Sequence, residues 1–143
     1  KPGQLYPACA KKRSQIDQRL QFNLGTFWQR IGDCVFPVCL GKTSTIPEEK
    51  IAALKEALLW ANQMVCGGYV VGNSMTLADI DFLASYSSLE ACGFISLEPY
   101  KALKTWAQAM KQQVPKYQDN CAKGAAVFGN WFNGNYTGKA KQG

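Results

Sequence analysis

A helix start near the middle of the chain constrains the fold more than any other feature. Thr76 is followed three residues later by Asp79, so the threonine hydroxyl can accept from the Asp79 amide while the carboxylate accepts from the Thr76 amide. Met75, directly before this capping box, and Ile80, in the first turn, can form a hydrophobic staple. The four residues predict a helix with a fixed starting residue and a fixed direction of entry.

The helix that follows, residues 76–92, is predicted to be buried on every side. Its large apolar side chains are spread round the whole circumference and not along one stripe; they are Leu77, Ile80, Phe82, Leu83, Tyr86 and Leu89. A helix that is apolar all round lies in a protein interior. We therefore expect a central core helix, with a structural and not a catalytic role for Asp79.

Apolar residues recur every three or four positions in other segments too, which predicts further helices. The longest, from about residue 7 to 40, carries the stripe Ile16, Leu20, Leu24, Phe27, Ile31, Cys34 and Val38. Pro37 is expected to kink it or end its regular part. Further helices are predicted over about 47–65, 99–114 and 117–132, the first of them capped by Thr45 with Glu48 closing a capping box. The expected fold is all-α, a bundle of about five helices around the buried helix 76–92.

The chain of 143 residues suits one domain, and 47% hydrophobic residues are enough for a single core. We assign residues 1–6 to a linker or domain edge, 7–132 to the helical domain and 133–143 to a disordered, Gly/Asn/Lys-rich tail.

Composition and charge exclude several function classes. No run of about 18 apolar residues exists, so no membrane span is expected. The net charge is +6, but only Lys11-Lys12-Arg13 form a cluster, so nucleic acid is not an expected partner. The six cysteines include no CxxC pair and the chain has no histidine, which excludes common zinc frameworks and histidine acid–base chemistry. We expect no metal, and reduced thiols in a cytoplasmic protein rather than a secreted disulfide scaffold.

A second apolar line on the long helix needs a different explanation from the first. Trp28, Val35 and Cys39 lie roughly 80° round from the core stripe at ~100° per residue, with Phe36 on the far side. This line can cover a ligand pocket, a neighbouring domain or a second subunit, or it can pack on another helix of the same core.

Read in order, these segments resemble a known family. Five stretches carry the resemblance, which covers residue 5 to about residue 132: Leu5-Tyr6-Pro7 with Lys12-Arg13; Asp17 to Leu20, Gly25 to Arg30 and Asp33 to Pro37; Gly72 to Ile80; Tyr100 to Trp106; and Pro115-Lys116-Tyr117. Together they are similar to the C-terminal domain of an insect-type cytosolic glutathione transferase of the delta or epsilon class, with Gly72 to Ile80 the most specific part.

The resemblance implies a function for the second apolar line. In that family a thioredoxin-like domain binds glutathione and holds the catalytic hydroxyl, while the helical domain forms most of the pocket for an apolar electrophile. The matching positions of the long helix are Trp28, Ile31, Val35, Phe36 and Cys39, with Phe128 or Trp131 approaching from the last helix. An apolar wall suits an apolar co-substrate.

The resemblance also implies partners and points to departures. A homodimer through the first two helices is expected, as is a thioredoxin-like domain that supplies glutathione as co-substrate. Asn23 replaces an acidic residue that organises charge around the γ-glutamyl end of glutathione, and Cys34 and Val35 replace tyrosines. The sequence shows no thioredoxin-like segment, catalytic residue or glutathione site, so this chain alone is expected to have no activity.

Two functions therefore stay open. The first is the hydrophobic-substrate-binding half of a glutathione transferase. The alternative is a non-catalytic helical module that binds another protein or an apolar ligand.

Overall fold

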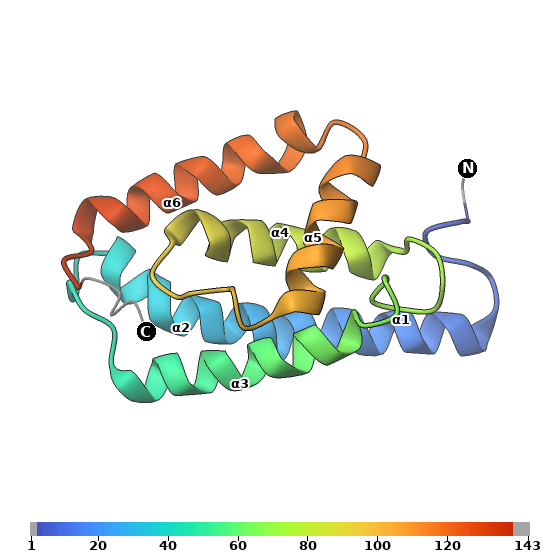
Figure 1. Cartoon of the computed structure of the whole chain (residues 1–143), viewed down its shortest axis with the longest axis horizontal. Helices are drawn as coiled ribbons and strands as arrows, with labels where there is room; N and C mark the ends of the chain where they lie inside the picture. The colour runs from blue at the N-terminus through green and yellow to red at the C-terminus, as the bar shows by residue number, and fades with distance from the viewer. Residues whose placement is uncertain (1–2, 139–143) are drawn as a thin grey trace.

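The structure, a computed structural model, describes residues 3–138 of the chain (Figure 1). Its elements in order are α1 (Ala10–Phe22), the π-helical segment η1 (Asn23–Phe27), α2 (Trp28–Cys39), α3 (Glu48–Met64), α4 (Leu77–Cys92), α5 (Lys101–Gln113), the π-helical segment η2 (Gln118–Ala122) and α6 (Lys123–Asn135). The described part contains no strand. Because α1, η1 and α2 follow one another without a break, as do η2 and α6, the elements form five rods. The predicted all-α bundle of about five helices is confirmed.

Helix α4 is the centre of the bundle, as its apolar residues predicted. In Figure 1 it lies between α6 and the α1–α2 rod, and α5 crosses it. Nine of its residues are buried: Ala78, Asp79, Phe82, Leu83, Ser85, Tyr86, Ser87, Leu89 and Cys92. They do not cover the whole circumference, because Leu77 is 40% exposed and Ala84 on the same side is exposed too, so the prediction that this helix is buried on every side is wrong for one side. The buried sides of α4 pack against α1, α5 and α6.

The capping box at the start of α4 is present, and Asp79 extends it into the core. Asp79 Oδ2 accepts from the Thr76 amide at 2.8 Å, while Oδ1 accepts from the Val70 amide at 2.9 Å and from Trp106 Nε1 at 3.0 Å. The carboxylate is fully buried, and these donors compensate for its lost hydration. Met75 and Ile80 are both half-buried, and the staple contact between them stays a prediction.

The π-helical segment in the long rod changes which residues face the core. A π-turn holds one more residue than an α-turn, so the residues after it are rotated about the axis. As a result Asn23 is buried while Leu24 is 64% exposed, although the spacing had placed Leu24 in the core stripe. Phe27 and Ile31, further along the rod, are fully buried as predicted.

The last residue of α2 agrees with the sequence prediction, whereas the first residues of α3 do not. Helix α2 ends at Cys39, two residues after Pro37, in keeping with the expected end of its regular part. Helix α3, by contrast, begins at Glu48 with Pro47 as its N-cap, so the predicted cap by Thr45 is wrong. The ring of Pro47 favours an extended Ile46 before it, and the Thr45 amide donates instead to Thr43 Oγ1 at 3.2 Å.

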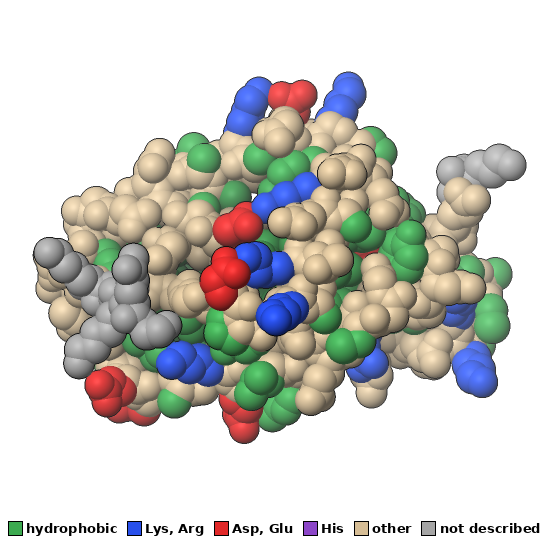
Figure 2. All heavy atoms as spheres, viewed as in Figure 1, with side chains coloured by type: hydrophobic (Ala, Val, Ile, Leu, Met, Phe, Trp, Pro, Cys, Tyr) green, Lys and Arg blue, Asp and Glu red, His purple; other side chains and the backbone are tan. Residues whose placement is uncertain are grey.

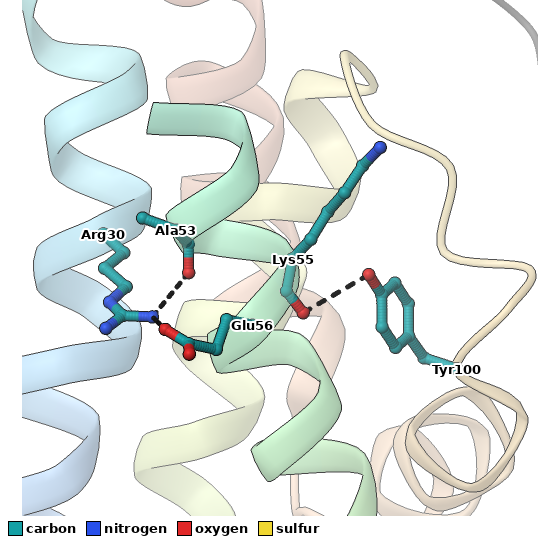
Figure 3. Close-up of polar contacts among 5 residues, drawn as sticks. All are labelled: Arg30, Ala53, Lys55, Glu56 and Tyr100. Carbon is teal, nitrogen blue, oxygen red and sulfur yellow. Dashed lines mark hydrogen bonds and ion pairs between the residues drawn. The ribbon is translucent and has the colours of Figure 1, made fainter. Parts of the chain in front are cut away.

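Polar contacts join α2 to α3 and α3 to the start of α5 (Figure 3). Arg30 Nη1 donates to Ala53 O at 2.6 Å and to Glu56 Oε2 at 2.8 Å, and Tyr100 Oη donates to Lys55 O at 3.5 Å. The Arg30 guanidinium on α2 therefore bonds two residues of α3 that lie about one turn apart, and these bonds help to fix α3 against α2.

The end of α6 lies against the end of α2, and the residues after it contact the loop that follows α2, where the Thr137 amide donates to Ser44 O at 3.0 Å. Asn135 Nδ2 donates to Cys39 O at 3.2 Å, and the Tyr136 ring stacks on Phe132 with centroids 4.8 Å apart. Helix α6 runs three residues past the predicted boundary at 132. Residues 139–143 of the predicted tail, and residues 1 and 2 of the predicted linker, lie outside the described part.

Candidate ligand site

Three aromatic side chains from α2 and α6 meet at the surface and form the aromatic cluster: Trp28, Phe36 and Phe128. The ring centroids lie 6.1 Å apart for Trp28 and Phe36, 5.9 Å for Trp28 and Phe128, and 6.0 Å for Phe36 and Phe128. Trp131 adjoins the cluster, 6.4 Å from Phe128. Phe36 is 37% exposed and Trp131 is 45% exposed, so the cluster is open to solvent on one side.

Two glycines allow this arrangement. A Cβ on Gly32 would lie 2.9 Å from Phe36 Cε2, so the missing side chain leaves the space that the Phe36 ring occupies. A Cβ on Gly129 would lie 2.5 Å from Ala91 O, so the absence of a side chain lets α6 approach α4 closely. This close approach positions Phe128, the residue before Gly129, relative to α4.

The six residues predicted to contact a substrate divide into two groups. Trp28 and Phe128 are half-buried and Phe36 is exposed, and these three meet as described. Ile31, Val35 and Cys39 lie instead in the hydrophobic core, at 0%, 0% and 4% exposure. Their predicted place in a pocket wall is corrected for the described chain, because α3, α4 and α6 all pack against α2 and these three side chains belong to the resulting core.

A groove of about 350 Å³ adjoins the cluster on the side toward α3, and we call it the α2 groove. It is lined by Trp28, Gln29, Gly32, Asp33, Phe36, Pro37, Leu40, Lys42 and Lys50. Leu40 is 58% exposed, which adds apolar surface at its mouth. The groove is large enough for a one- or two-ring aromatic molecule.

A smaller depression of about 230 Å³ lies between η1 and α4, and we call it the polar depression. Its lining residues are Asn23, Leu24, Trp28, Asp81, Ala84, Ser85 and Ser88. Asn23 Nδ2 donates to Asp81 Oδ2 at 2.7 Å, while Asn23 Oδ1 is buried and has no hydrogen-bond partner among residues 3–138. Trp28 lines both hollows, so its indole lies between them.

The spacing of apolar residues gave no indication of several lining residues. Lys42 and Lys50 belong to a loop and to the first turn of α3, and Asp81 belongs to a different helix from Asn23. Charged side chains lie at scattered places on the face that Figure 2 shows, and exposed charged residues carry no periodic signal, so only the packing of α2 against α3 and α4 brings these residues to one site.

The buried thiols are poorly suited to nucleophilic chemistry, and no group of metal ligands is found in the part of the chain that the structure describes. All six cysteines are free, and burial raises the pKa of the Cys34 and Cys92 thiols to about 12, which makes them poor nucleophiles. No three Cys, Asp or Glu side chains among the described residues are grouped as metal ligands. None of the helices described above is both long and apolar enough to span a bilayer.

Comparison with known proteins identifies the fold. Residues 34–113 match the profile of the glutathione S-transferase C-terminal domain. A delta-class glutathione transferase from Nilaparvata lugens is 35% identical to this chain, with a TM-score of 0.89 over 94% of this chain and 62% of that one. A glutathione transferase from Bombyx mori is 28% identical, with a TM-score of 0.85 over 92% of this chain and 61% of that one.

An epsilon-class glutathione S-transferase from the housefly Musca domestica is 24% identical and has the same fold, with a TM-score of 0.84 over 94% of this chain and 62% of that one. The chain thus spans less than two thirds of the length of each of these three proteins. The resemblance seen in the residues to the insect delta and epsilon classes is confirmed. The chain belongs to the glutathione S-transferase family, and its fold is the C-terminal helical domain of that family.

Proposed function

We propose that this chain is the hydrophobic-substrate-binding half of a glutathione transferase. The observation that carries the proposal is the aromatic cluster, which is exposed beside the α2 groove while the rest of that helix face is buried. An exposed cluster of aromatic rings beside a hollow is the usual form of a site for an apolar molecule. The comparisons favour this function over a non-catalytic module, because the relatives named above are glutathione transferases.

In the proposed reaction this chain holds the electrophile and orients it. A thioredoxin-like domain supplies the catalytic hydroxyl and binds glutathione, whose thiolate attacks the electrophile and displaces a leaving group or adds to an activated carbon. The aromatic cluster excludes water from one face of the electrophile, and its rings restrict the orientation of the bound molecule. Catalytic residues and metals are not assigned to this chain.

The polar depression supports a contribution of this chain to the binding of glutathione as well. The family resemblance implies an acidic residue where this chain has Asn23. Here Asp81 on α4 brings a carboxylate to within 2.7 Å of the Asn23 amide nitrogen, so a negative charge is kept at this place by another helix. We propose that Asp81 takes the role that the resemblance gives to an acidic residue at position 23.

A homodimer through the α1–α2 rod and α3 is part of the same proposal. On α3, Leu59 is 54% exposed and Trp60 is 37% exposed, and the Arg30 guanidinium lies 5.0 Å from the Trp60 ring centroid. Adjacent exposed apolar side chains with an arginine stacked beside them are typical of protein interfaces.

Binding of the neutral dye Nile red tests the proposed function. We expect Trp28→Ala and Phe128→Ala each to weaken binding about tenfold, because each removes an aromatic wall worth ~1.5 kcal/mol or more. Leu77→Ala is the matched control, since Leu77 is a 40% exposed apolar side chain at the start of α4 that lines neither hollow, and it should leave the affinity unchanged. Equal effects of all three substitutions, or no saturable binding, would contradict the proposal.

Conjugation of glutathione to 1-chloro-2,4-dinitrobenzene by the product of the whole coding region tests the reaction. We expect turnover, an increased KM for the electrophile in Phe128→Ala, and an increased KM for glutathione in Asp81→Asn. Absence of turnover with this and other general electrophiles would refute the enzymatic part of the proposal.

A further inference from the structure

Thr137, which follows α6, bonds to the loop that joins α2 to α3. The Thr137 amide donates to Ser44 O at 3.0 Å, and the Thr137 hydroxyl donates to the same carbonyl oxygen at 3.3 Å. In Figure 1 the end of α6 lies beside this loop. We call the two bonds the latch, because they join two residues that are 93 positions apart in the sequence.

The residues before Thr137 give the latch a fixed base. Asn135 Nδ2 donates to Cys39 O at 3.2 Å, and the Tyr136 ring stacks on Phe132 with the ring planes 28° apart. Phe132 is fully buried, so the Tyr136 ring lies on the edge of the hydrophobic core. Because Thr137 follows directly, its two donors are held close to the end of α2.

The loop that the latch holds has little buried surface of its own. No residue from 41 to 45 is buried. The Lys42 and Thr43 amides donate to Pro37 O at 2.9 and 3.3 Å, which ties the first half of the loop to α2. Backbone segments with few buried apolar contacts open easily, so a second anchor at Ser44 has a large effect on how often this loop opens.

The same loop forms one edge of the proposed ligand site. Leu40, directly before the loop, and Lys42, within it, both line the α2 groove. Leu40 is 58% exposed, so the packing around its side chain is too sparse to fix its position. A change in the path of the loop therefore changes the mouth of the groove.

We propose that Thr137 is a positioning residue of the ligand site. Through Ser44 it holds residues 40–44 against the end of α2 and so keeps the mouth of the α2 groove in the shape that binds a ligand. Thr137 does not line the groove, so it acts through the loop and not by contact with the ligand. The inference rests on the proposed function, because it concerns the same site.

The substitution Thr137→Pro removes both donors of the latch. Proline has no amide hydrogen and no hydroxyl, and it favours an extended residue before it. Tyr136 already has φ −84° and ψ 121°, so its backbone accepts a following proline. Thr137→Val is the matched control, because it keeps the β-branched shape and the amide donor and loses only the longer of the two bonds.

Amide hydrogen exchange of the ¹⁵N-labelled chain tests whether the latch holds the loop. We expect the Lys42 and Thr43 amides to exchange about two- to tenfold faster in Thr137→Pro than in the wild type, as for one lost hydrogen bond. Thr137→Val should have a smaller effect. The Val114 amide, which donates to Met110 O at the end of α5, should exchange at the same rate in all three proteins. Unchanged exchange of Lys42 and Thr43 in Thr137→Pro would refute the latch.

Binding of Nile red by the same proteins tests whether the loop matters to the site. We expect Thr137→Pro to weaken the affinity about two- to threefold, because a smaller fraction of molecules has the loop in place, and Thr137→Val to retain most of it. Faster exchange in the loop with unchanged affinity would refute the positioning role and leave the aromatic cluster as a site. Failure of the wild-type chain to bind Nile red would refute the proposed function itself.

Discussion

Replacement of Gly129 by alanine tests the packing that positions the aromatic cluster. A Cβ built on Gly129 would lie 2.5 Å from Ala91 O, 2.8 Å from Ala91 C and 2.9 Å from Ala91 Cβ. Two of these three atoms belong to the backbone of α4, so a side-chain rotation cannot relieve the overlap. Helix α6 must instead move away from α4 by about 0.9 Å to restore an ordinary contact of about 3.4 Å.

The expected loss of stability follows from two opposing effects. Overpacking of a close-packed interface costs about 1–3 kcal/mol, and the better helix propensity of alanine returns up to about 1 kcal/mol. We expect the free energy of unfolding of Gly129→Ala to fall by about 1–2 kcal/mol. With a urea m-value of about 2 kcal/mol/M, the midpoint of unfolding falls by roughly 0.5–1 M.

Gly124 provides a control on the same helix. It lies within α6, and a Cβ there would meet no atom within 4 Å. The same substitution, Gly124→Ala, should therefore raise the free energy of unfolding, by up to about 1 kcal/mol. The assay is urea unfolding followed by circular dichroism at 222 nm. If Gly129→Ala proved as stable as Gly124→Ala, the close contact of α6 with α4 would be wrong.

Three further predictions concern the core and the site. Asp79→Ala leaves the Val70 amide and Trp106 Nε1 buried without an acceptor, and we expect urea unfolding to show a loss of at least about 3 kcal/mol; a loss below about 1 kcal/mol would contradict the buried network. Burial raises the pKa of Cys34 and Cys92 to about 12, above that of an unfolded thiol, so stability is complete below about pH 9 and falls as the pH rises toward 12; midpoints equal at pH 8 and pH 10.5 would refute this. Gly32→Ala displaces the Phe36 ring, and fluorescence titration should show weaker Nile red binding with the urea midpoint lowered by no more than about 0.3 M; unchanged binding would contradict the role of that ring.

Local signals in the sequence were sufficient to place the central helix. The hydrogen bonds of a capping box join residues within one turn, so Thr76 and Asp79 identify the start of α4 without tertiary information. The contacts of Asp79 with Val70 and Trp106 were beyond the reach of the sequence, since they depend on how α4 and α5 pack. The sequence therefore revealed where α4 starts, but it gave no sign that Asp79 links this helix start to Val70 and to Trp106 of α5.

Register was the weakest part of the sequence prediction. Apolar spacing of three or four residues suits an α-helix with or without a π-turn, so nothing in the spacing distinguishes Asn23 from Leu24 as the buried residue. The spacing of apolar residues also could not show whether Val35 and Cys39 face the core or a pocket. Their exposure is decided by the packing of α3, α4 and α6 onto α2, and these helices lie further along the chain. Trp28 reaches the surface because it lies nearer the start of α2, where the α2 groove and the polar depression adjoin it.

The most direct test of the ligand site is a titration of the ¹⁵N-labelled chain with nitrobenzene, a neutral and unreactive aromatic, followed by the indole N–H signals of the four tryptophans. The account predicts that the Trp28 signal shifts saturably, while Trp106 in the core and Trp60 on α3 do not move. A shift confined to Trp60, or no saturable shift of Trp28, would contradict the assignment of the aromatic cluster as the place where an apolar substrate binds.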